Sequence, residues 1–160
     1  MMHRFICSPP EVSSVMTAKA FAEGFMTDIS THPYDATFLK TVCSECNAGF
    51  FGTKERCENC ASEQVERATL AERGEIHTYT VQRFPPPEPY RLGSTDRDEW
   101  EPQPVAYVDL EEVRVIGLVD ADPEHVEIGN TVEIAVEPGW QTDDDDDVLI
   151  YKFVLVGDPQ

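Results

Sequence analysis

Residues 43–60 hold four of the chain's five cysteines: Cys43, Cys46, Cys57 and Cys60. Two residues separate the members of each pair, and ten residues separate the pairs. A turn across two residues aims both thiolates at one ion, and two such turns facing each other give tetrahedral coordination by four sulfurs. The spacing therefore predicts a bound metal ion.

We expect the ion to be structural Zn²⁺, because structural zinc sites are closed and four-coordinate. Iron in a rubredoxin-type site is the alternative. A catalytic zinc needs an open coordination position, and four cysteines leave none. Thiolates bound to a metal are not free for disulfide exchange, and no other group of residues makes a complete active site. We therefore predict no catalytic residue in this chain.

Residues 1–40 are predicted to be an N-terminal helical segment and linker. Ser13 or Ser14 can cap a helix over roughly 14–27. Its apolar residues recur at a spacing that makes one stripe on a helix, and they are Val15, Ala18, Phe21, Ala22, Phe25 and Met26. We favour packing of this stripe on its own chain over docking in a partner's groove.

After the cysteines, apolar residues alternate with polar ones, as in half-buried strands. We predict a zinc ribbon over 41–63 and a second domain over 64–160. The predicted strands are 65–70, 75–84, 105–110, 113–119, 131–137 and 148–156. Five short strands and one long insertion favour an OB-fold barrel. The expected fold is thus mainly β: an N-terminal helix, a rubredoxin-like ribbon and a five-stranded OB-fold barrel.

A proline-rich stretch at 85–104 interrupts the strands and is predicted to be a long loop. A loop of this length in a compact domain is usually functional or disordered. Aromatic anchors dominate many interfaces, and arginines hold phosphates. The candidate residues for contact with a partner or a phosphate-bearing ligand are therefore Arg83, Phe84, Pro86, Tyr90, Arg91, Arg97 and Trp100. The other interpretation is that the aromatic residues pin the loop to its own barrel and the arginines are solvated.

Charge limits the partners. The chain has 31 acidic and 12 basic residues, a formal net charge of −19. Nucleic-acid binders usually meet the phosphate backbone with clustered Lys and Arg, so nucleic acid is not an expected partner. The longest apolar run, 148–156, is too short to span a membrane. With no secretory signal pattern in the first residues, we expect a cytoplasmic protein.

The order of these parts resembles a known family. After the ribbon come G-E-I-H-T-Y-T-V, P-V-A-Y-V-D-L, V-R-V-I-G-L-V and D-P-E-H-V-E-I-G-N-T-V-E-I. In this order the chain, from about residue 35 to its end, is similar to the zinc-ribbon and OB-fold proteins that accompany thiolase-type enzymes. The long 85–104 insertion and the Asp-rich 143–147 segment depart from that pattern.

The resemblance implies a small non-catalytic subunit that binds a thiolase-like or other CoA-dependent enzyme. Such subunits serve acetoacetyl-CoA synthesis, steroid side-chain degradation and anaerobic aromatic catabolism, where the partner carries the catalytic cysteine. The resemblance also implies a role in organising the complex and in receiving acyl-CoA, so that the contact residues of the 85–104 loop would meet the partner or the phosphates of coenzyme A (CoA). Two alternatives stay open: a nucleic-acid-binding module, because OB-folds and zinc ribbons often bind nucleic acid, and a rubredoxin-like electron carrier.

Overall fold

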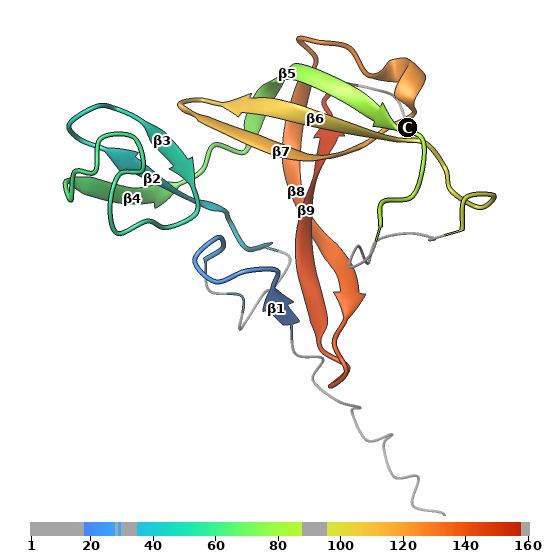
Figure 1. The fold of residues 1–160 in the computed structure, drawn as a ribbon, viewed down its shortest axis with the longest axis horizontal. Helices are drawn as coiled ribbons and strands as arrows, with labels where there is room; N and C mark the ends of the chain where they lie inside the picture. The colour runs from blue at the N-terminus through green and yellow to red at the C-terminus, as the bar shows by residue number, and fades with distance from the viewer. Residues whose placement is uncertain (1–17, 28, 30–34, 88–95, 158–160) are drawn as a thin grey trace, which may run out of the picture.

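The fold was analysed in a computed structural model, which describes residues 18–27, 29, 35–87 and 96–157. Strands dominate these residues (Figure 1). In chain order they are β1 (Ala18–Ala20), β2 (Leu39–Cys43), β3 (Gly49–Phe51), β4 (Val65–Thr69), β5 (Arg73–Gln82), β6 (Gln103–Leu110), β7 (Val113–Asp120), β8 (Thr131–Gln141) and β9 (Asp147–Leu155). One 3-10 turn, Pro123–His125, joins β7 to β8.

Five of these strands close into a barrel in the order β5-β6-β7-β9-β8, and β8 pairs back onto β5. All contacts within the barrel are antiparallel except that between β7 and β9. This is the strand order of a five-stranded OB-fold barrel. The prediction of a mainly β protein with a five-strand barrel is confirmed. Glu111 and Glu112, between the predicted strands 105–110 and 113–119, form a tight hairpin turn that leaves Leu110 paired with Val113.

The prediction of an N-terminal helix is wrong. The described part of the chain contains no α-helix, and residues 18–20 form β1, which pairs in parallel with β9. Turns follow, with Gly24 at a φ of +77°, a conformation that does not belong to a right-handed helix. Met26 then forms an isolated bridge with Phe38. The first residues of the predicted helix, including Val15, lie outside the described residues.

The apolar residues of this N-terminal segment nevertheless pack on their own chain. Met26 is 8% exposed, and Phe21 packs against the core cluster. The ring centroid of Phe21 lies 5.1 Å from that of Phe25 and 5.5 Å from that of Tyr151 on β9. Helix propensity is a weak prior that tertiary contacts override. Here the aromatic contacts come from strands far along the chain.

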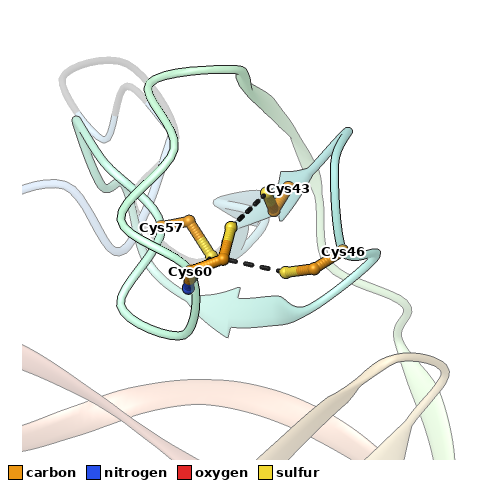
Figure 2. A group of neighbouring side chains, drawn as sticks. All are labelled: Cys43, Cys46, Cys57 and Cys60. Carbon is orange, nitrogen blue, oxygen red and sulfur yellow. Dashed lines mark hydrogen bonds between the residues drawn. The ribbon is translucent and has the colours of Figure 1, made fainter.

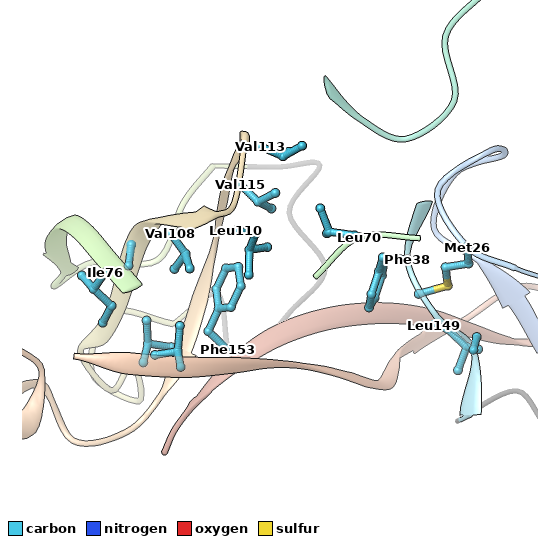
Figure 3. Close-up of a cluster of buried hydrophobic side chains, with 14 of the residues drawn as sticks. Met26, Phe38, Leu70, Ile76, Val108, Leu110, Val113, Val115, Leu149 and Phe153 are labelled. Atoms are coloured by element: carbon cyan, nitrogen blue, oxygen red, sulfur yellow. The ribbon is translucent and has the colours of Figure 1, made fainter. Parts of the chain in front are cut away.

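The barrel interior is filled by side chains that alternate along the strands. Ile76, Val108, Leu110, Val132 and Phe153 are at most 1% exposed and form its centre. Figure 3 shows this cluster continuing toward the N-terminal segment and the small sheet. Within the barrel, every second residue of β6 and β7 points inward, as the two-residue period of a strand requires.

A second sheet, in the order β3-β2-β4, carries the cysteine segment (Figure 1). Its attachment to the barrel centres on Lys40, a β2 residue whose side chain is 10% exposed. The Nζ atom of Lys40 lies 2.8 Å from Oε2 of Glu111 and 2.7 Å from Oε1 of Glu112. Both carboxylates belong to the β6–β7 turn, so this ion triad joins the two sheets. The division of the chain at residues 40 and 63 stays a prediction.

The β8–β9 hairpin is longer than predicted and extends away from the barrel (Figure 1). Residues 138–141, which lie outside the predicted strand 131–137, continue β8, with an irregularity between Pro138 and Trp140. Pro138 is tolerated there because proline occurs at strand edges and bulges. The extension is where β1 joins β9, and Lys19 forms an ion pair with the buried Asp146 at the hairpin's end.

Gly74 lies where strands β5 and β6 approach too closely for any side chain. A Cβ atom added there would lie 2.2 Å from the carbonyl oxygen of Asp109 and 2.8 Å from Cδ2 of Leu110. We expect Gly74→Ala to lower the free energy of unfolding by about 2–3 kcal/mol, because strand β6 must move. Urea denaturation measures the effect, and Thr80→Val, at an exposed position of the same strand, should change it by less than about 0.5 kcal/mol. An unchanged stability of Gly74→Ala would contradict the close approach of β5 and β6.

Candidate metal centre

Each cysteine pair lies on a tight turn. Cys43 ends β2, and the backbone N–H of Asn47 donates to the carbonyl oxygen of Cys43 at 2.9 Å. Ala61 repeats this contact with Cys57, also at 2.9 Å. Asn47 and Ala61 have φ values of 58° and 61°, in the left-handed region that asparagine adopts more readily than alanine. The two turns therefore have the same local geometry despite different residues at the left-handed position.

The turns bring the four thiols together (Figure 2). Their Sγ atoms all lie within 4.8 Å of one another. Sγ of Cys43 is 3.6 Å from that of Cys60, and Sγ of Cys46 is 3.6 Å from that of Cys57. Metal–sulfur bonds of about 2.3 Å in a regular tetrahedron set the sulfurs about 3.8 Å apart. The cluster thus has the size and the donor set of a four-sulfur metal site.

Without a metal ion, the surroundings of the thiols shift their pKa values in opposite directions. Nδ2 of Asn59 lies 3.5 Å from Sγ of Cys46, and this contact is the main cause that lowers the pKa of Cys46 to about 6. At Cys60 the backbone N–H of Ser62 lowers the pKa, but burial and the neighbouring thiols raise it to about 12. Four thiols this close cannot all ionise without a cation, because like charges disfavour one another. A metal ion held by the four sulfurs would supply that cation.

Asn59 is a site residue that the sequence reasoning missed. It lies inside the second Cys-x-x-Cys turn, and hydrogen bonds to ligand sulfurs orient and tune metal sites. The position between the two cysteines was the available signal. The nearby cations Lys54 and Arg56 are paired with carboxylates instead of sulfurs: Lys54 with Glu58, and Arg56 with Glu63.

The candidate contact residues of the proline-rich loop have two different surroundings. Trp100 is 8% exposed, and its Nε1 donates to the carbonyl oxygen of Gln82 at 3.0 Å, so it packs on its own barrel. Phe84 is 60% exposed, and the guanidinium of Arg97 lies 4.7 Å from the centre of its ring. Arg83 is exposed and Pro86 half-buried. Tyr90 and Arg91 lie outside the described residues.

Arg83 and Arg97 differ from the other cations of the described part of the chain. Each of the others forms an ion pair with at least one carboxylate, and these are Lys19, Lys40, Lys54, Arg56, Arg67, Arg73, Arg114 and Lys152. Within the described ranges, Arg83 and Arg97 have no carboxylate partner. They are the cations available to an anionic group from outside.

Comparison with known proteins assigns the chain to a family. It is 32% identical over 114 residues to a DUF35 domain-containing scaffold protein of Methanothermobacter thermautotrophicus, covering 69% of this chain and 79% of the relative. This chain belongs to the DUF35-domain family. A DUF35 domain-containing scaffold protein of Pyrococcus furiosus is 29% identical, over 71% of this chain and 82% of the relative.

Other comparisons agree with this DUF35 assignment. Residues 68–137 match the family described as the ChsH2 C-terminal OB-fold domain, which spans most of the barrel. Subunit BbsA of the benzoylsuccinyl-CoA thiolase of Geobacter metallireducens is 29% identical, over 81% of this chain and 84% of the relative. In fold, the DUF35 chain is similar to a solved structure of an Ltp2-ChsH2(DUF35) aldolase, with a TM-score of 0.52, 21% identity, and coverage of 74% of this chain and 84% of the other.

The part of this DUF35 protein that the structure describes contains no helix with the length and apolar character needed to cross a membrane.

Proposed function

We propose that this protein is a non-catalytic accessory subunit of a thiolase-type acyl-CoA enzyme complex, in which it organises the partner and helps to receive the CoA thioester. The observation that carries the proposal is the similarity along 84% of the length of a subunit of benzoylsuccinyl-CoA thiolase. Two scaffold proteins of the same family add support. C–C bond chemistry on the thioester then belongs to the partner.

The role assigned to the metal is structural. We propose Zn²⁺ at Cys43, Cys46, Cys57 and Cys60, because four thiolates complete a tetrahedral shell and leave no position for substrate. The ion stabilises a three-stranded sheet that is too small to fold on its own core, since metal binding is largely folding free energy in such sites. The sheet in turn contacts the barrel through Lys40.

The proline-rich loop supplies the proposed contacts. Phe84 offers an exposed aromatic ring, and Arg97 stacks on it. Arg83 and Arg97 have no carboxylate partner among the described residues, so they suit a carboxylate of the partner or a phosphate of CoA. Trp100 fits a different role, because its ring is buried against the chain's own barrel and holds the start of β6 in place.

Purification from the native host tests the proposal. A tagged chain, eluted gently, should carry one thiolase-type or other CoA-dependent enzyme in a fixed ratio, with one zinc per chain. Phe84→Ala should reduce recovery of that enzyme about tenfold or more, as loss of an interface anchor does. Ile128→Ala is the matched control, because Ile128 is 67% exposed and lies outside the loop.

Three results would contradict the proposal. Elution of the tagged chain without any CoA-dependent enzyme would leave the proposed function without support. Recovery of nucleic acid that dissociates steeply with salt would indicate a nucleic-acid module instead. Stoichiometric iron with a red colour would indicate a rubredoxin-like electron carrier.

A further inference from the structure

The outer face of β5, β6 and β7 carries two uncharged rows. In the strand register, Thr78, Tyr107 and Ile116 lie side by side, and Thr80, Val105 and Leu118 form the next row. Their chain neighbours point inward, since Ala106, Val108 and Val115 are at most 2% exposed. We call these six residues the outer patch: Thr78, Thr80, Val105, Tyr107, Ile116 and Leu118.

The outer patch departs from what a solvated sheet face carries. Antiparallel sheets with one face on the core usually alternate apolar residues inward with polar residues outward. Here Tyr107 is 45% exposed and Ile116 is 48% exposed, and they are direct cross-strand neighbours. None of the six outward positions carries a charge. An apolar patch framed by polar residues is typical of an interaction site.

A groove continues the outer patch toward the β8–β9 extension. It has a volume of about 370 Å³, and its lining includes Val105 and Leu118 of the patch. The remaining lining is largely apolar: Phe21, Gln82, Gly117, Trp140, Ile150 and Tyr151. Two of the three strands that carry the patch, β6 and β7, are the second and third of the barrel, and OB-folds bind their ligands on the face of these strands. A groove of this kind accepts an apolar side chain of a partner, as interface hot spots do.

The rim of the outer patch is acidic. At one end lies a cleft with four carboxylates and one lysine, which is paired with Glu137; these residues are Glu101, Asp120, Asp122, Glu137 and Lys152. At the other end Asp109 is held by Arg114, at 2.5 Å from Nε to Oδ1, and Glu75 pairs in register with Asp109. Carboxylates thus outnumber cations on both sides. A complementary surface has an apolar centre within a ring of Lys and Arg.

We propose that the outer patch is the docking surface for the thiolase-type subunit, which presents an apolar side chain to the groove and basic residues to the rim. The inference rests on the proposed function and adds a sheet face to the loop contacts proposed there, since Gln82 of the groove lies two residues before Phe84. A second copy of this chain is a poorer occupant. A twofold contact would set the same acidic rim against itself, between two chains that each carry −19.

The test measures binding of purified variants to the CoA-dependent enzyme that co-elutes with the wild-type chain. Ile116→Glu places a charge in the middle of the patch and should weaken binding about 30-fold or more. Tyr107→Ser should weaken it in the same direction without adding a charge. Ile128→Glu is the matched control, since Ile128 is exposed outside the patch. It should bind like the wild type, and all three variants should keep the wild-type thermal midpoint.

The outcomes separate the inference from the proposed function. If no CoA-dependent enzyme co-elutes with the wild type, the proposed function fails and the inference falls with it. If the enzyme co-elutes and binds Ile116→Glu as tightly as Ile128→Glu, the inference alone is wrong. A wild-type dimer that Ile116→Glu converts to a monomer would assign the patch to a second copy. Association that does not slow as salt is raised would contradict the basic ring on the partner.

Discussion

Replacing Cys43 with serine is expected to abolish stoichiometric metal binding and to unfold the small β2–β3–β4 sheet, while barrel strands β5 to β9 stay folded. Cys43 is fully buried at the end of β2, and its Sγ is one of the four clustered sulfurs of the proposed metal site. Structural zinc contributes on the order of 10–16 kcal/mol to the folding of small metal domains at neutral pH. The sheet's own apolar contacts cannot replace a contribution of that size.

Metal analysis and hydrogen exchange of backbone amides measure the two effects separately. Cys7→Ser is the matched control, because it removes the fifth cysteine and should leave the ion in place. Acidification should have the same effect as the Cys43→Ser change. The cysteine thiols must be deprotonated to bind metal, so the ion is released as pH falls. A Cys43→Ser variant that keeps one ion per chain and slow exchange in β2 would contradict the closed four-sulfur site.

The second large effect is expected at the ion triad between the sheets. Changing Glu111 and Glu112 together to Gln leaves the ammonium of Lys40 buried without an anionic partner. We expect the free energy of unfolding to fall by about 2 kcal/mol: removing the partner of a buried charge costs more, but Glu111 is largely exposed and its share is screened. The triple variant that adds Lys40→Met buries no charge and should regain most of the loss.

The pH dependence of this effect has a definite sign. The hydrogen bond from Lys40 lowers the pKa of Glu112 below its ordinary value of 4.5, so the stabilisation is complete above that value and is lost as pH falls. Hydrogen bonds to Glu111 and then Glu112 raise the pKa of Lys40 above 10.5, so its stabilisation is lost only as pH rises past that value. The difference between wild type and double variant should therefore be constant from about pH 6 to about pH 9. A triple variant no more stable than the double variant would contradict the role of Lys40.

Local patterns were sufficient to predict the parts of the fold that depend on neighbours in sequence. The Cys-x-x-Cys turns need only a few residues each, so their spacing alone predicts that the four thiols come together. The period of two marks the barrel strands because their inner face is buried. The pair Glu111 and Glu112 between two strands indicates the hairpin directly.

The failures come from contacts between distant residues. The spacing of Phe21 and Phe25 suits a helix, but their ring partners Phe51 and Tyr151 come from β3 and β9. Gly24 was the signal against a helix, since glycine at a positive φ ends regular structure. Nothing in the sequence around Lys40 indicates a partner, because its two carboxylates lie far along the chain. The outer patch was also missed, since Tyr107 and Ile116 become neighbours only through the β6–β7 register.

The parallel pairing of β1 with β9 joins an early part of the chain to a late one. During synthesis, Ala18–Ala20 leaves the ribosome long before Asp147–Leu149, its partner segment, has been made. The small sheet and barrel strands β5 to β8 lie between these segments, so they can pair first, as contacts that span less of the chain generally do. The closing step of folding therefore brings the two distant segments together on the β8–β9 extension. The same step completes the groove beside the outer patch, because Phe21 follows β1 directly.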